Sequence, residues 1–263
     1  MSHSPRKRFG QNFLRDESVI EGIARAVAPS AADHLVEIGP GEGALTAALV
    51  GSGCQLDAIE LDRDLRPRLL AAFSTYPNFH LHSADALSFD FSSLLNERTQ
   101  LRVVGNLPYN ISTPLIFRLL EQSELIQDMH FMLQKEVVDR LAAGPGGKDW
   151  GRLGVMAQFQ CAVEHLFDVP PEAFYPAPKV QSAIVRLTPH ATPKWPKTDR
   201  AALATVVTQA FSQRRKTLRN NFKGQLCDAD FEYLQIDPAA RAETLSIEAF
   251  VRITEFIAGR SRE

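Results

Sequence analysis

Short apolar runs alternate with amphipathic stretches through the first half of the chain, and this alternation restricts the fold more than any other feature. Strand-like runs recur at residues 34–38, 55–59, 79–82, 101–104 and 129–133. Helix-like stretches follow most of them, at residues 44–50, 64–73, 113–122 and 135–143. Strands that alternate with helices need right-handed crossovers and form a mainly parallel, doubly wound sheet. We therefore predict an α/β fold.

The second half of the chain shows a different pattern. Residues 163–169 and 180–187 read as two more strands with prolines between them, which favours an antiparallel excursion at the sheet edge. Residues 189–196 are rich in proline and form the expected linker. Beyond it, apolar residues recur at helical spacing through residues 199–222 and 246–257. We predict a main domain over residues 1–189 and a small helical domain over residues 190–263.

Positive charge is concentrated in two short stretches, although the formal net charge of the whole chain is only −2. Residues 1–15 contain Arg6, Lys7, Arg8 and Arg15 without an acid, and residues 212–223 contain five basic side chains without an acid. Such a stretch either binds a polyanion or forms a solvated helix face. Because five unpaired cations repel one another, we favour nucleic-acid contact for residues 212–223. Neither stretch by itself specifies DNA, RNA or a membrane.

Secretion, membrane insertion and a metal centre are not indicated by the sequence. The basic N-terminus is not followed by an apolar segment, and no apolar run is long enough to span a bilayer. Cys54, Cys161 and Cys227 are odd in number, far apart and without a CxxC pair. Neither a disulfide framework nor a zinc cluster is therefore indicated. We expect a cytoplasmic protein without a bound metal.

A glycine turn and acids at the carboxyl ends of three successive strands predict a nucleoside ligand. Residues 37–43 read Glu-Ile-Gly-Pro-Gly-Glu-Gly between the first strand and its helix, where a doubly wound sheet binds ligands. The spacing is GxGxG and not the GxGxxG of dinucleotide sites, so a bound pyrophosphate is poorly supported. Glu60 ends the second strand, where it can accept both ribose hydroxyls, and Asp85 follows the third, where it can accept an adenine amino group. Alternatively, Glu60 pairs with Arg63 and Asp85 caps a turn. Together, the acids and the turn favour a nucleoside without phosphate.

The tetrapeptide Asn106-Leu107-Pro108-Tyr109 directly follows the apolar run 101–105 and is suited to holding a planar amine. The side-chain oxygen of Asn106 can accept one N–H of an exocyclic amino group. Pro108 favours an extended backbone at Leu107, which can aim the Leu107 carbonyl at the other N–H. Tyr109 can stack on the ring that bears the amine. An ordinary turn at a strand end is the alternative interpretation of these four residues.

An ordered series of motifs gives the chain a family resemblance. The motifs are Phe-Gly-Gln-Asn-Phe-Leu at 9–14, Val-Glu-Ile-Gly-Pro-Gly at 36–41, Ile-Glu-Leu-Asp at 59–62, Asp-Ala at 85–86 and Asn-Leu-Pro-Tyr-Asn-Ile-Ser at 106–112, continued at 132–137, 175–180 and 213–217. This series resembles the ribosomal RNA adenine N6-dimethyltransferases that use S-adenosylmethionine, over nearly the full length. It is most similar to the bacterial small-subunit members, which dimethylate two adjacent adenosines near the 3′ end of 16S rRNA.

The resemblance implies a Rossmann-like class I methyltransferase sheet, S-adenosylmethionine as the cofactor and no metal. It implies that the donor pocket is lined by Asn12, Leu14, Gly39, Gly41, Glu60, Asp85, Ala86 and Asn106. Asn106, Leu107 and Tyr109 are the implied catalytic residues, with Phe174 as a second stacking surface for the target adenine. We expect Arg214, Arg215, Lys216 and Arg219 to contact phosphates of 16S rRNA in the small (30S) subunit. We expect a monomer with a role in small-subunit biogenesis.

Three other functions remain open at this stage. A large-subunit rRNA or DNA adenine methyltransferase shares the amine-holding loop, although residues 144–153 and the C-terminal basic stretch resemble the small-subunit group better. The chain also fits a ribosome-assembly or RNA-binding factor in which binding is separable from methylation. A nicotinamide-dependent oxidoreductase is disfavoured by the GxGxG spacing.

Overall fold

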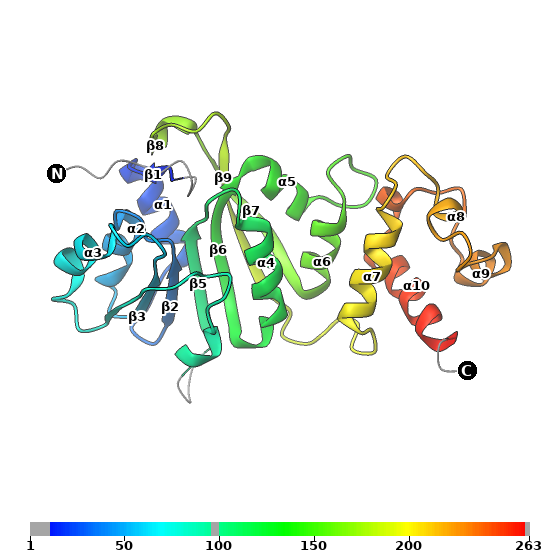
Figure 1. The fold of residues 1–263 in the computed structure, drawn as a ribbon, viewed down its shortest axis with the longest axis horizontal. Coiled ribbons are helices and arrows are strands. Elements are labelled where there is room, and N and C mark those ends of the chain that lie inside the picture. The colour runs from blue at the N-terminus through cyan, green and yellow to red at the C-terminus, as the bar shows by residue number, and fades with distance from the viewer. Residues whose placement is uncertain (1–10, 96–99, 261–263) are drawn as a thin grey trace. The chain divides into compact units, whose positions relative to one another are not determined.

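The computed structural model describes residues 11–95 and 100–260 (Figure 1). The chain forms two compact units: the first comprises residues up to Val138 together with Glu164–Pro189, and the second comprises Asp139–Val163 together with residues from His190 onward. The predicted boundary after residue 189 coincides with one of these divisions. The prediction that the second domain consists of residues 190–263 alone is wrong, because residues 139–163 contribute a helix that packs among the C-terminal helices.

The first unit is built on a seven-stranded sheet in the order β4-β3-β2-β5-β6-β9-β7. Its strands are β2 (His34–Ile38), β3 (Gln55–Ile59), β4 (Phe79–His82), β5 (Leu101–Asn106), β6 (Ile126–Gln134), β7 (Cys161–Val169) and β9 (Ser182–Pro189). The β4-β3-β2-β5-β6 pairs are parallel, and β9 is antiparallel to β6. The prediction of a doubly wound α/β sheet with an antiparallel excursion is confirmed. Central strands such as β2 are buried along their whole length, as parallel strands covered on both faces require.

The helices of the first unit are α1 (Glu17–Val27), α2 (Ala44–Val50), α3 (Arg66–Phe73) and α4 (Ser112–Glu121), and α5 (Lys135–Ala142) begins in it. Helix α1 was not predicted from the sequence. Its start is set by Asp16, whose carboxylate accepts hydrogen bonds from the backbone N–H groups of Ser18 and Val19. Helices α1, α2 and α3 bury apolar side chains in one core cluster with the sheet, which places their N-termini beside the strand ends.

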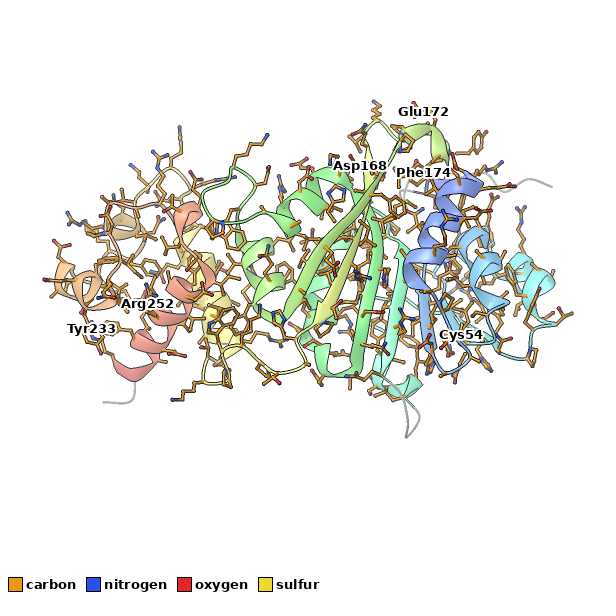
Figure 2. All side chains as sticks on the ribbon, turned by 180° about the vertical axis from the view of Figure 1, so that it is seen from behind. Cys54, Asp168, Glu172, Phe174, Tyr233 and Arg252 are labelled. Atoms are coloured by element: carbon orange, nitrogen blue, oxygen red, sulfur yellow. The ribbon has the colours of Figure 1, made fainter. Side chains whose placement is uncertain are left out.

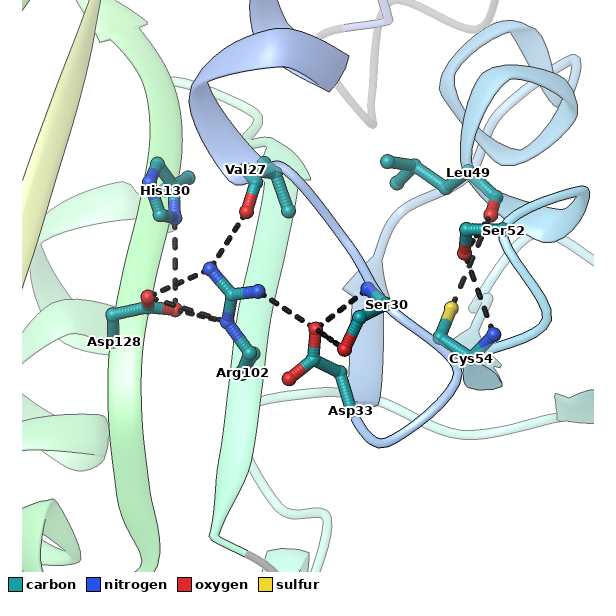
Figure 3. A network of polar contacts seen from close by, with 9 residues as sticks. All are labelled: Val27, Ser30, Asp33, Leu49, Ser52, Cys54, Arg102, Asp128 and His130. Atoms are coloured by element: carbon teal, nitrogen blue, oxygen red, sulfur yellow. Dashed lines mark hydrogen bonds and ion pairs between the residues drawn. The ribbon is translucent and has the colours of Figure 1, made fainter.

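A buried ionic network attaches α1 to the sheet (Figure 3). Arg102 of β5 donates through Nε and Nη2 to the carboxylate of Asp128 on β6, at 3.0 and 2.8 Å, and through Nη1 to Asp33 at 3.0 Å. Its Nη2 also donates, at 2.7 Å, to the carbonyl oxygen of Val27, which is the last residue of α1. The network therefore connects two neighbouring strands with the C-terminus of the helix that lies over the sheet.

The second unit is helical, with α6 (Arg152–Gln160), α7 (Arg200–Ala210), α8 (Leu218–Asn221), α9 (Asp228–Leu234) and α10 (Ile247–Arg260). The predicted helix over 246–257 corresponds to α10. The predicted continuous helix over 199–222 is wrong, because α7 ends at Ala210 and a turn leads to α8. The amide of Asn221 donates to the carbonyl of Ala210 at 2.6 Å and so satisfies the end of α7 from outside the helix. Arg214, Arg215 and Lys216 consequently lie on the turn between the two helices.

Candidate active site

A cavity of about 210 Å³ lies at the carboxyl ends of the parallel strands in the first unit. Its walls come from the glycine turn after β2, the ends of β3 and β5, the segment after β4 and the segment 11–14. All eight residues predicted for the donor pocket line it: Asn12, Leu14, Gly39, Gly41, Glu60, Asp85, Ala86 and Asn106. Leu107 and Tyr109 line the same cavity. Residues that are far apart in the sequence meet here because parallel strands end at one edge of the sheet.

The glycine turn needs glycine for two different reasons. Gly41 has a φ of +61°, and a Cβ there would lie 3.1 Å from the ring of Phe13 on β1 (Phe13–Leu14). Gly43 has a φ of +86°, and its Cβ would lie 2.6 Å from the ring of Phe73 on α3. Side chains of β1 and α3 therefore pack tightly against the turn, and its left-handed backbone favours glycine.

The two predicted acids face the cavity while backbone groups hold them. Glu60 accepts from the N–H of Gly41 at 3.2 Å and from the N–H of Asp62 at 2.7 Å, so backbone N–H groups, and not the proposed Arg63, fix its carboxylate. Burial raises the pKa of Glu60 above its ordinary value. Asp85 accepts from the N–H of Leu87 at 2.9 Å. Asp85 therefore caps a turn, as the alternative interpretation proposed, and also lines the cavity.

Two buried cavity residues were not among the site residues predicted from the sequence. Glu37 is only 2% exposed and accepts a hydrogen bond of 2.6 Å from the hydroxyl of Thr46 on α2. Burial, with the nearby charge of Glu60, raises the pKa of Glu37 to about 7. His130 of β6 is also buried, and its Nε2 has no hydrogen-bond partner among the described residues. Burial holds the pKa of His130 well below its usual range. A titratable residue type within a largely apolar strand was the available signal for both.

Replacing Glu37 with glutamine should make the stability of the protein less dependent on pH. A carboxyl group whose pKa is raised on folding contributes stability that is present below the unfolded value of 4.5 and lost as pH rises through about 7. As pH rises across this interval, the wild type should lose up to about 3 kcal/mol of unfolding free energy that Glu37→Gln does not lose. Urea unfolding of both proteins at about pH 4.5, 6 and 8 measures the difference. A difference that does not change with pH would contradict the buried, proton-binding carboxyl group.

The loop 106–109, which was predicted to hold an amine, is anchored at both ends of its tetrapeptide. Asn106 is the last residue of β5, and its Nδ2 donates to the carbonyl oxygen of Asn12 at 3.0 Å. This bond orients the amide so that its oxygen remains available as an acceptor. Leu107 is buried and its N–H donates to the carbonyl of Met132 at 3.2 Å. The hydroxyl of Tyr109 lies 3.1 Å from Oγ of Ser182.

Gly105 explains how this loop comes so close to the glycine turn. A Cβ at Gly105 would lie 2.5 Å from the carbonyl oxygen of Ile38, which ends β2. No side chain fits between the two strand ends, because the obstructing atom belongs to the backbone. The absence of a side chain at Gly105 thus brings the carboxyl ends of β2 and β5 together.

Phe174 does not lie where the prediction requires it. It is 5% exposed, packs in the core cluster with α1 and α2, and is not among the described residues that line the cavity (Figure 2). It belongs to β8 (Phe174–Tyr175), which pairs antiparallel with β1, and successive residues of a strand face opposite sides. Phe174 therefore faces inward and Tyr175, which is 57% exposed, faces outward. In this conformation Phe174 offers no surface for a target base.

The basic residues of the second unit are only partly free to bind a polyanion. Arg214 donates to Glu243 at 3.1 Å and to the carbonyl of Lys148, and Arg219 pairs with Asp228 at 3.0 Å. Arg215 and Lys216 are exposed and make no ion pair with any described residue. The stretch 212–223 itself contains no acid. Acids that lie outside it, Glu243 and Asp228, nevertheless pair with two of its cations. Arg6, Lys7 and Arg8 lie outside the described residues.

In residues 11–95 and 100–260, no group of three or more His, Cys, Asp or Glu side chains is arranged to hold a metal ion. None of the helices in that part of the chain is both long and apolar enough to cross a membrane.

Comparisons with known proteins relate this site to rRNA methylation. The family model described as ribosomal RNA adenine dimethylase matches residues 2–259. The chain is 57% identical over 260 residues to ribosomal RNA small subunit methyltransferase A of Pseudomonas putida, covering 99% of the chain and 97% of the relative. It is 59% identical over 256 residues to the protein of the same name from Pseudomonas aeruginosa, covering 97% and 96%.

Solved structures extend the comparison to the fold. A dimethyladenosine transferase from Plasmodium falciparum superposes with a TM-score of 0.79 at 24% identity, covering 95% of the chain and 98% of that structure. The 23S rRNA methyltransferase ErmE superposes with a TM-score of 0.72 at 26% identity, covering 94% and 100%. The class I methyltransferase fold predicted from the motifs is thus confirmed.

Proposed function

This chain belongs to the ribosomal RNA adenine dimethylase family, and from this premise we propose that it methylates N6 of two adjacent adenosines near the 3′ end of 16S rRNA, using S-adenosylmethionine, to give N6,N6-dimethyladenosines. Relatives at 57% and 59% identity are named small-subunit rRNA methyltransferases. One observation carries the proposal. Glu60 and Asp85, the acids predicted to bind a nucleoside, line the same cavity as Asn106, Leu107 and Tyr109. The proposed donor site and the proposed amine-holding loop therefore lie in the same cavity.

The residues that line the cavity fit S-adenosylmethionine. Glu60 would accept the ribose hydroxyls and Asp85 the adenine amino group, while Gly39 and Gly41 allow the backbone to approach the ligand closely. Asn12 lies in the segment that completes the wall. The cofactor supplies a methyl group that its sulfonium sulfur already activates, so that positioning provides most of the acceleration.

The 106–109 loop would hold the target amine. The lone pair of an adenine amino nitrogen is delocalised into the ring, which makes the nitrogen a poor nucleophile. Two acceptors, the Asn106 side-chain oxygen and the Leu107 carbonyl, would favour a more tetrahedral nitrogen whose lone pair points at the methyl group. The target base must leave its stack, and Tyr109 would replace part of the lost stacking. We propose that the loop also leaves space for the first methyl group, since dimethylation requires the amine to turn.

The proposed substrate sets the partner and the location. The small (30S) ribosomal subunit would present the rRNA, and the enzyme would act as a monomer in the cytoplasm during subunit biogenesis. A fold shared with a solved 23S rRNA methyltransferase does not discriminate between the two ribosomal targets. The higher identity to relatives named for the small subunit favours 16S rRNA.

Methylation of undermethylated small subunits with a tritiated donor tests the function. We expect label in two adjacent adenosines near the 3′ end of 16S rRNA, recovered as dimethyladenosine, and none in large subunits or duplex DNA. Label confined to large-subunit rRNA or to DNA would replace this function with the corresponding alternative. Accumulation of only monomethyladenosine at saturating donor would refute the proposed space for the first methyl group.

Removing Arg215 and Lys216, the two turn cations without an ion pair to any described residue, should weaken rRNA binding in a salt-dependent way. Each phosphate contact contributes a slope of about 0.7 to 0.9 to the dependence of log K on log salt. We expect the Arg215→Gln/Lys216→Gln variant to lower the slope by about one to two such contributions. The matched control, Lys197→Gln/Arg241→Gln, removes two exposed cations of the same unit outside the turn. If the slope of log K against log salt were equal for wild type, variant and control, the turn would not be part of the rRNA-binding surface.

A further inference from the structure

The strand β1 forms part of the wall of the donor cavity. Residues Gln11 to Leu14 line the cavity, and within the described residues β1 pairs with the two-residue β8. On the cavity side, the Asn12 carbonyl accepts from Asn106 and the Gln11 amide donates to Asp62 at 2.9 Å. A two-residue antiparallel pair is marginal by itself, but both residues of β1 are also buried. Contacts from the residues beside the strand add to this packing.

Arg15, the residue directly after β1, contacts the structures on both sides of the strand. Its Nη2 donates to Oε2 of Glu42 in the glycine turn at 3.0 Å, and its guanidinium carbon lies 4.9 Å from the centre of the Tyr175 ring on β8. The Arg15 backbone N–H donates to the carbonyl of Ala173 at 2.8 Å, which continues the β1–β8 pairing. One side chain thus bridges the glycine turn and β8 across the end of β1.

Arg15 and Tyr175 act at a distance from any ligand in the cavity. Neither is among the described residues that line it, whereas Glu42 does line it. An effect of either side chain on ligand affinity would have to pass through β1.

We propose that Arg15 is a positioning residue that, through its ion pair with Glu42 and its stack on Tyr175, holds β1 against the methyl-donor cavity. This inference rests on the proposed function, because it takes the ligand of the cavity to be the methyl donor. The contacts are partly exposed, with 57% of the Arg15 side chain and 28% of the Glu42 side chain accessible. Exposed ion pairs and cation–π contacts are weak, so their loss should raise the dissociation constant of the donor by about three- to tenfold.

Calorimetric titration of the full-length protein with S-adenosylhomocysteine, the demethylated product of the donor, tests the proposal. Arg15→Gln and Tyr175→Leu should each weaken binding, and the double variant should lose less than the product of the two factors because both changes break one stack. Arg15→Lys should recover part of the affinity by keeping the charge beside Glu42. The rise in the dissociation constant should be smaller at high salt, because salt screens the Arg15–Glu42 ion pair. The turnover number at saturating donor should be unchanged.

Arg25→Gln is the matched control, because Arg25 is also an exposed arginine in an ion pair but its partner is Glu21 on α1 and not a residue of the glycine turn. Wild-type affinity in Arg15→Gln, a penalty equal to that of Arg25→Gln, or full multiplicativity with Tyr175→Leu would each overturn the positioning role. A fall in turnover number with unchanged affinity would overturn it as well. If the wild type itself failed to bind S-adenosylhomocysteine, the proposed function would fail first, which separates the two results.

Discussion

Replacing Asn106 with alanine should lower the rate of methyl transfer by about 10²- to 10³-fold, as losing one aligned hydrogen-bonding group in an active site commonly does. The change removes the side-chain oxygen proposed to accept an N–H of the target amine. It also removes the donor to the Asn12 carbonyl, so the affinity for S-adenosylhomocysteine should fall with it. Single-turnover methylation of small subunits and calorimetry measure the two effects separately.

The Asn106→Asp variant separates the two roles of this side chain. Its carboxylate keeps an acceptor for the amine but places an oxygen against the Asn12 carbonyl, where the amide now donates. We expect weaker donor binding than in the wild type and a chemical step faster than in Asn106→Ala. Wild-type turnover in Asn106→Ala would exclude the residue from catalysis. If cells that carry Asn106→Ala assemble small subunits as well as wild-type cells do, the main contribution of the chain is to assembly, by binding.

Replacing Arg102 with alanine should destabilise the protein by about 3–5 kcal/mol, the usual cost of removing one partner from a buried ion pair. Arg102 and Asp128 are each only 8% exposed, and Arg102 makes hydrogen bonds to Asp128, Asp33 and the Val27 carbonyl (Figure 3). The substitution leaves Asp128 buried without its cation and the C-terminus of α1 without its donor. The midpoint and slope of urea unfolding report the loss.

A double variant distinguishes the desolvation penalty from the loss of packing. In Arg102→Met/Asp128→Leu no buried charge is left unpaired, so we expect it to recover a substantial part of the stability lost in Arg102→Ala. Asp33 is more exposed and can be solvated in either variant. A loss below about 1 kcal/mol in Arg102→Ala would show that water already screens the network. Because the network lies away from the described cavity lining except at His130, donor affinity measured well below the unfolding midpoint should change little.

Several predictions from the sequence match the structure because they depend on residues close together in the chain. The strands at 34–38, 55–59 and 79–82 and the helix at 44–50 have the predicted bounds, since the spacing of apolar residues is a local property. The parallel order then brings the glycine turn, Glu60, Asp85 and Asn106 to one cavity. Helix α1 was missed although Asp16 at its start was an available capping signal.

The remaining differences arise where distant segments meet. The predicted helix over 199–222 breaks because Asn221 returns to the carbonyl of Ala210, a contact that apolar spacing does not report. Phe174 and Tyr175 are both aromatic, and only the pairing of β8 with β1 decides which of them enters the core.

The sequence by itself determined the α/β order of the first unit and indicated a nucleoside ligand and a loop suited to an amine, because strand periodicity, turn glycines and side-chain chemistry act within a few residues. Tertiary structure alone decided that residues 139–163 belong with the C-terminal helices, that Glu37 and His130 are buried in the cavity wall, and that Arg214 and Arg219 are neutralised. The physical reason is that burial and ion pairing depend on which segments the fold brings together. Arg15 illustrates this, since its two partners lie 27 and 160 residues further along the chain.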